Sequence, residues 1–204
     1  MQGQEYLNQI SASNRPVKKS GSGLLSSKFF IVGAIGVISL VLILIIGAIL
    51  SGGKGGEKDL SYALYAHINS TSEEIGEFQE FIKTSSLRSD AGSLNGILSN
   101  TKTKLTAYLE GKYKFKEKSI DKKTLANAEK AKTELHDELF EAKINGVLDR
   151  TFAHKMSYEV SMFMIEENKI LKSTKSDELK ELLQESYSSL ENLYPNFDEF
   201  SEGK

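Results

Sequence analysis

The chain offers few residues for acid–base or metal chemistry, because it has three histidines and no cysteine. His67, His136 and His154 lie far apart, and none forms the His-Glu-x-x-His spacing that holds zinc on one helix face. His67 stands beside an apolar stripe, where we expect a hydrogen-bonded histidine at a helix interface. His136 stands beside Asp137 and Glu138, in what we expect to be a surface charge cluster. We therefore predict that the protein has no catalytic residue, cofactor or metal ligand and that it is not an enzyme.

Composition excludes further chemistry. A chain without cysteine has no disulfide, thiolate metal site or cysteine nucleophile. It also lacks the Gly-x-Ser-x-Gly elbow of hydrolases and a phosphate-cradling loop. We expect Glu74, Glu77 and Glu80 to form a solvated face, and we expect no nucleic-acid partner.

One segment indicates a partner by its charge. Residues 112–132 carry eight lysines and three acidic residues, a net charge of +5. Its first lysines alternate with two aromatic residues: Lys112, Tyr113, Lys114, Phe115, Lys116 and Lys118. An extended chain would place these lysines on one side and the aromatic anchors on the other. The four lysines are therefore candidates for binding a polyanion, such as anionic lipid or a wall polymer. Alternatively, they neutralise residues 177–204, which have a net charge of −6.

The elements that position this segment begin with a long apolar run. Phe29 to Leu50 is 22 residues without a charge. At about 1.5 Å per residue such a helix crosses a hydrocarbon core of about 30 Å. The run is longer than the apolar region of a cleaved signal. We predict a transmembrane helix whose partner is the lipid bilayer, while cleavage at "SGG", residues 51–53, is the alternative.

The charges that flank this run predict its orientation. Residues 1–28 hold four basic side chains and one acidic one, whereas residues 51–60 are neutral. Positive flanks stay in the cytoplasm. We therefore predict a single-pass protein of the cell membrane with a cytoplasmic N-terminus and an extracytoplasmic C-terminal domain. Residues 1–28 should be a disordered leader, and the glycine-rich residues 51–56 a flexible tether.

The remainder, residues 57–195, is patterned as helix throughout. Apolar residues recur at steps of three and four, which is typical of amphipathic helices. The predicted helices cover residues 57–84, 89–110, 121–144, 148–173 and 177–194. We predict an all-α antiparallel bundle of four or five helices, with a long crossover at residues 111–147.

Local signals predict the helix ends. Ser89 or Asp90 should cap the second helix, and Gly111 should end it. The stripe continues in phase through residues 145–149, which favours a bend over a full loop. Pro195 should follow the last helix, leaving residues 196–204 as a disordered tail.

A shift of 85 residues aligns the two predicted hairpins without a gap. Glu74 then falls on Glu159 and Phe78 on Phe163. Leucines of the second helix fall on those of the last in the same way. We interpret this as a structural duplication of one helical hairpin.

The stretch from "LDRTFAHKMSYEV" to "LENLYP", residues 148–195, resembles the second hairpin of uncharacterised ferritin-like envelope domains of bacteria. The resemblance covers residues 57–195 and implies a ferritin-like bundle. Metal-bearing members place one glutamate on each of two helices and Glu-x-x-His on the other two. Glu74 and Glu159 match the first pair, but residues 89–110 and 177–194 contain no histidine, which argues against a di-iron site.

These features predict a membrane-anchored, non-enzymatic envelope protein whose helical domain binds a protein partner or an anionic polymer. A ferritin-like metal-binding or redox protein is the alternative, as is a sensor ectodomain. Oligomeric state is left open by the sequence.

Overall fold

The computed structural model describes residues 56–202, and every element in this part of the chain is a helix. In chain order the elements are α3 (Glu57–Phe78), η1 (Gln79–Phe81), α4 (Ser85–Tyr113), η2 (Glu117–Ser119), α5 (Lys122–Ile144), α6 (Leu148–Ser173) and α7 (Asp177–Glu202). The prediction of an all-α bundle is confirmed.

The predicted anchor lies outside the described residues. This applies to the leader, residues 1–28, to the apolar run Phe29–Leu50 and to residues 51–55 of the tether. Among residues 56–202, no helix has the length and apolarity needed to cross a membrane.

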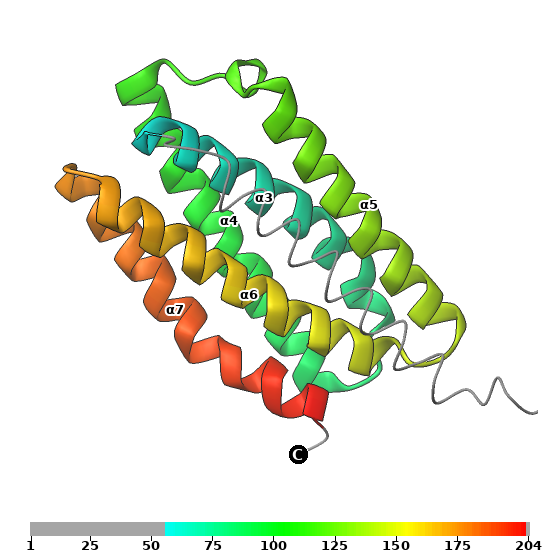
Figure 1. Cartoon of the computed structure of the whole chain (residues 1–204). Coiled ribbons are helices and arrows are strands. Elements are labelled where there is room, and N and C mark those ends of the chain that lie inside the picture. The colour runs from blue at the N-terminus through cyan, green and yellow to red at the C-terminus, as the bar shows by residue number, and fades with distance from the viewer. Residues whose placement is uncertain (1–55, 203–204) are drawn as a thin grey trace, which may run out of the picture. The chain divides into compact units, whose positions relative to one another are not determined.

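Four helices form a ring in which α3, α4, α7 and α6 each contact the next, and α5 lies outside it against α3 and α6 (Figure 1). Successive helices run in opposite directions along the bundle (Figure 1). The hairpins α3–α4 and α6–α7 are therefore joined by a connection that is itself mostly helix, since α5 runs back along their full length.

The core is built from the apolar stripes. Its largest fully buried side chains are aromatic: Phe78, Phe152, Phe163 and Phe197. The buried residues of α7 follow steps of three and four: Leu179, Leu182, Leu183, Ser186, Leu190, Leu193 and Phe197. Mutual burial of such stripes stabilises helices that would be marginal alone in water.

The start of α4 differs from the prediction. It begins at Ser85, with Thr84 rather than Ser89 or Asp90 at the cap. The Thr84 side chain accepts no capping hydrogen bond from the backbone of α4. Instead Asp149 of α6 accepts hydrogen bonds from the backbone of Lys83 (3.0 Å) and from Thr84 N and Oγ1 (2.8 and 2.7 Å). A residue from another helix therefore holds this turn, which local sequence rules do not detect.

The predicted bend at residues 145–149 is wrong, because α5 ends at Ile144 and the chain reverses in a tight turn. Gly146 adopts a left-handed conformation, φ 72°, that suits glycine. Val147 N then donates to Ala142 O at 2.9 Å, and Gly146 N donates to Lys143 O at 3.2 Å. This is the Schellman arrangement that ends helices.

The last helix is longer than predicted. Pro195 lies inside α7, which continues to Glu202, so the predicted disordered tail is wrong for residues 196–202. Proline removes one backbone hydrogen bond and crowds the preceding turn. The complete burial of Phe197 two residues later supplies apolar contacts that favour continuing the helix.

The two hairpins correspond at a shift of 92 residues rather than 85. At this shift Ser85, where α4 begins, falls on Asp177, where α7 begins. Buried Glu74 falls on buried Glu166. At the predicted shift the first turn, residues 79–84, would fall inside α6. The predicted register is therefore wrong by seven residues, one heptad, a spacing at which helical burial patterns nearly repeat.

We expect Phe78→Ala or Phe163→Ala to lower the free energy of unfolding by about 3–5 kcal/mol, because each leaves a cavity in the core. Phe140→Ala is the control, since this ring is about half exposed, and it should cost about 1 kcal/mol or less. Urea unfolding of residues 54–204 measures the difference. Losses under 1 kcal/mol at both core positions would contradict this packing.

Candidate functional site

The predicted basic loop is divided among several local structures. Lys112 lies in the last turn of α4, which runs past Gly111 to Tyr113. Lys114 ends that helix in a left-handed conformation, φ 56°, and Lys118 lies in η2. The prediction of one extended strand with alternating sides is therefore wrong, because helical hydrogen bonding continues through its first residues.

The aromatic residues anchor this segment on the bundle, as the alternation predicted. Phe115 is buried and packs edge-to-face on Tyr62 and Tyr65 of α3, with ring centroids 5.0 and 4.9 Å away. The Tyr113 hydroxyl donates to Glu57 Oε1 at 2.8 Å. These contacts fix the backbone that carries the lysines.

The lysines themselves have different environments. Lys112 Nζ lies 2.7 Å from Glu57 Oε1 and is therefore neutralised by α3, not by the acidic α7. Lys114, Lys116 and Lys118 are exposed. None of these three forms an ion pair with a carboxylate of residues 56–202. Their charge is therefore directed to solvent.

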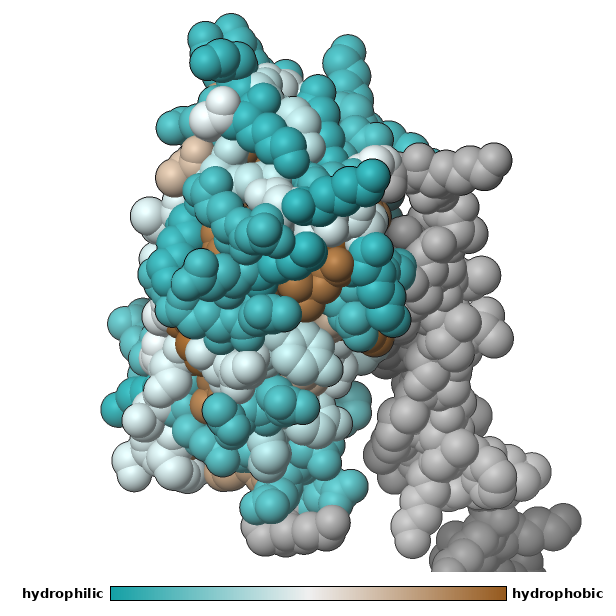
Figure 2. Space-filling view, turned by 90° about the vertical axis from the view of Figure 1, so that its left-hand side faces the viewer, coloured by the Kyte–Doolittle hydropathy of each residue, from teal (hydrophilic) through white to brown (hydrophobic). Residues whose placement is uncertain are grey.

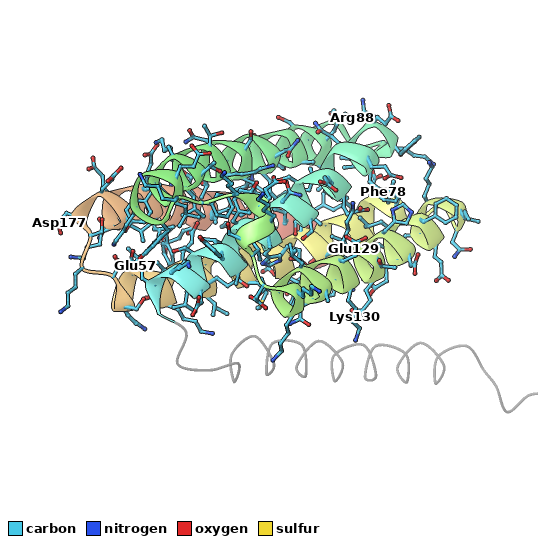
Figure 3. The ribbon with its side chains drawn as sticks, turned by 90° about the horizontal axis from the view of Figure 1, so that it is seen from above. Glu57, Phe78, Arg88, Glu129, Lys130 and Asp177 are labelled. Atoms are coloured by element: carbon cyan, nitrogen blue, oxygen red, sulfur yellow. The ribbon has the colours of Figure 1, made fainter. Side chains whose placement is uncertain are left out.

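Glu57 lies at the end of the bundle where α3 begins (Figure 3) and accepts four hydrogen bonds there. Its Oε1 accepts from Tyr108 (2.5 Å), Lys112 (2.7 Å) and Tyr113 (2.8 Å), and its Oε2 accepts from Thr174 (2.7 Å). Burial alone would raise the pKa of Glu57, but these bonds outweigh it and lower the pKa to about 2. One carboxylate thus ties the start of α3 to the end of α4 and to the α6–α7 turn.

A second polar cluster lies between α3 and α6. His67 Nε2 lies 2.7 Å from Glu159 Oε2, and its Nδ1 lies 3.0 Å from Glu166 Oε2. The Phe163 ring covers it at 4.3 Å between centroids. Burial would lower the pKa of His67, but the two carboxylates raise it to about 10. The prediction that His67 is a hydrogen-bonded histidine at a helix interface is confirmed. At neutral pH it is a cation that lies between the carboxylates of Glu159 and Glu166.

A third polar group crosses the bundle core. Thr101 Oγ1 of α4 lies 2.8 Å from Ser186 Oγ of α7, which donates to Glu167 Oε1 of α6 at 2.6 Å. Burial raises the pKa of Glu167 to about 8, and Glu166 adds to the effect. Glu167 is therefore largely a neutral carboxyl at neutral pH, which suits its place in the core.

The predicted solvated face on α3 is wrong for Glu74. Its side chain is 2% exposed, and its Oε2 lies 3.0 Å from His136 Nδ1 of α5. Glu77, one turn on, approaches the same nitrogen at 3.8 Å. Burial raises the pKa of Glu74, although the bond to His136 opposes this rise. Glu159 instead faces His67, so the two glutamates matched to ferritin-like ligands have different partners.

Figure 2 shows a largely hydrophilic face with small hydrophobic areas near its centre. The large exposed apolar side chains of the described residues include four near the α5–α6 turn: Phe81, Phe140, Ile144 and Val147. Lys143 of α5 lies over the Phe81 ring of η1, and this contact joins the two elements. Lys114, Lys116 and Lys118 thus lie at the end of the bundle where α3 begins, and these four exposed apolar side chains lie at the opposite end.

Comparison with protein-family models, curated proteins and solved structures gave no match. The geometry of these clusters is therefore the basis for a functional conclusion.

We expect His67→Gln to lower the free energy of unfolding at pH 6 by about 3–5 kcal/mol, because it leaves Glu159 and Glu166 without their cation. A raised histidine pKa contributes stability that is present below about pH 6.5 and lost as pH rises through about 10. The difference from the unsubstituted protein should therefore shrink across that range. His154→Gln, at an exposed position, is the control. If the difference in free energy of unfolding stayed constant between pH 6 and pH 10, the ion pairs of His67 with Glu159 and Glu166 would be contradicted.

Proposed function

We propose that this chain is a single-pass, membrane-anchored, non-enzymatic protein whose extracytoplasmic helical bundle binds an anionic surface through Lys114, Lys116 and Lys118. The supporting observation is that these lysines are exposed and lack carboxylate partners among residues 56–202, while Phe115 fixes their backbone. A fixed cluster of unpaired charges attracts anions more strongly than the same charges paired internally.

The chain's own connectivity favours lipid headgroups as this surface. Six residues, 51–56, separate the proposed span Phe29–Leu50 from α3. Fully extended, they reach about 20 Å. The connection that carries Lys114, Lys116 and Lys118 joins the end of α4 to the start of α5, at the end of the bundle where α3 begins (Figure 1). In this proposal the tether keeps the lysines near the membrane that holds the anchor, and a wall polymer or an acidic protein is the competing ligand.

The ferritin-like alternative has both support and a difficulty. Two antiparallel hairpins joined by a full-length connection resemble the connectivity of ferritin-like bundles. However, α4 and α7 contain no histidine, and Glu74 and Glu159 bond to different partners. We therefore propose a ferritin-like architecture without the di-metal chemistry of that class.

The proposed topology has a direct test. A protease added to intact cells without an outer barrier should reach a tag after Lys204 and should not reach a tag before Gln2, because the leader carries the positive charge. Cells permeabilised with detergent are the control, in which both tags should be cut. Protection of the C-terminal tag in a membrane-bound protein would reverse the orientation.

The binding proposal predicts that residues 54–204 associate with vesicles containing anionic lipid. Changing Lys114, Lys116 and Lys118 together to glutamine should weaken this binding roughly 100-fold, at about 1 kcal/mol per lysine. Binding should also fall steeply as salt shortens the Debye length. Co-sedimentation with vesicles at several salt concentrations provides the measurement.

A matched control removes three positive charges from the opposite end, by changing Lys83, Lys143 and Arg150 to glutamine. It should change vesicle binding less than threefold. Equal losses in the two variants would show that net charge alone matters. Absence of any binding at low salt would defeat the proposal for lipid, and salt-sensitive binding to wall polymer alone would reassign the ligand.

A further inference from the structure

A group of metal-type ligands lies between α3 and α5, apart from the basic segment. Glu74 and Glu77 are one turn apart on α3, and His136 faces them from α5. One ligand atom from each lies within 4.8 Å of the other two. His136 Nδ1 is 3.0 Å from Glu74 Oε2 and 3.8 Å from Glu77 Oε2.

These separations suit a small divalent cation. Zinc bonds of about 2.0–2.2 Å to nitrogen and oxygen place the ligands of a tetrahedral site about 3.4 Å apart. The two distances from His136 Nδ1 lie on either side of this value. Small rotations of the two glutamates would therefore be enough to enclose an ion, without moving a helix.

The burial of the group distinguishes it from an ordinary surface cluster. Glu74 is 2% exposed, and its hydrogen-bond partner is an imidazole rather than a lysine or arginine. Lys132 of α5 bonds to Glu73 instead, at 2.5 Å. Glu77 and His136 are more open, with side chains 54% and 36% exposed, and leave a route from solvent. The site thus combines a buried carboxyl ligand with an accessible entrance.

The rings around His136 orient it toward the carboxylates. Phe78 contacts it edge-on at 5.4 Å between centroids, and Phe140 stacks on it at 6.1 Å. A ligand held by packing needs less reorganisation when an ion binds.

We infer that Glu74, Glu77 and His136 bind a divalent first-row transition metal such as zinc, with water completing the coordination. The imidazole favours zinc, iron, nickel or copper over magnesium and calcium, which prefer oxygen ligands. The bound ion would join α5 to α3. This inference is independent of the proposed lipid contact, since it involves neither the same residues nor the same end of the bundle.

The test is calorimetric titration of the full chain in detergent with zinc at pH 7, in the presence of millimolar magnesium. We expect one zinc per chain, and a zinc-dependent rise in the thermal unfolding midpoint, because the ion binds the folded state. His136→Gln and Glu77→Gln should each weaken binding at least tenfold and reduce that rise. Both positions are partly exposed, so the variants should fold, which circular dichroism checks.

The matched controls are His154→Gln and Glu80→Gln, an exposed histidine and an exposed glutamate outside the group. They should change zinc affinity less than twofold. The inference is overturned if zinc does not bind stoichiometrically, if magnesium displaces it, or if the control variants weaken binding as much as His136→Gln does.

Discussion

The burial of α3 is the constraint on which the rest of the bundle depends. This helix contacts α4, α5 and α6, so that side chains on three of its sides are removed from water. Its stripe is not wholly apolar, since it includes the buried Glu74 and the largely covered His67. Ionisable groups in such positions are costly unless they are paired. The partners come from α5 and α6, and they fix how those helices lie against α3.

The same constraint explains how α5 is attached. Its buried side chains are few, namely Leu135, Leu139 and Ala142. Several of its other contacts are ionic: His136 with Glu74, Lys132 with Glu73, and Glu138 with the buried Lys155 of α6. An ion shared by α3 and α5 would therefore act where the bundle has the least apolar attachment. The helices of the four-helix ring supply most of the apolar core, and α5 adds Leu135, Leu139 and Ala142 to it.

The two ends of the bundle differ in a way that bears on function. At one end Glu57 joins the start of α3 to the end of α4 and to the α6–α7 turn, and Phe115 holds the basic segment beside it. Because these residues are engaged internally, Lys114, Lys116 and Lys118 remain available to a partner. The proposed contact with an anionic surface therefore rests on two observations besides the number of lysines. Phe115 packs on α3, and Glu57 pairs with Lys112 and not with the other three lysines.

The sequence by itself determined the helical class and the approximate extent of the helices, because apolar spacing reflects which face is buried whatever covers it. It also predicted the anchoring role of Phe115 and the interfacial role of His67. Only the tertiary structure decided which polar residues meet. Glu74 and His136 are 62 positions apart, and neither local propensity nor spacing indicates that α5 packs beside α3. The register of the hairpins was missed because helical burial patterns nearly repeat after one heptad. The bonds of Asp149 to the turn before α4 and the extension of α7 past Pro195 were missed because a single sequence does not show which segments meet. Each depends on contacts between distant segments, which outweigh the local signals that a single sequence displays.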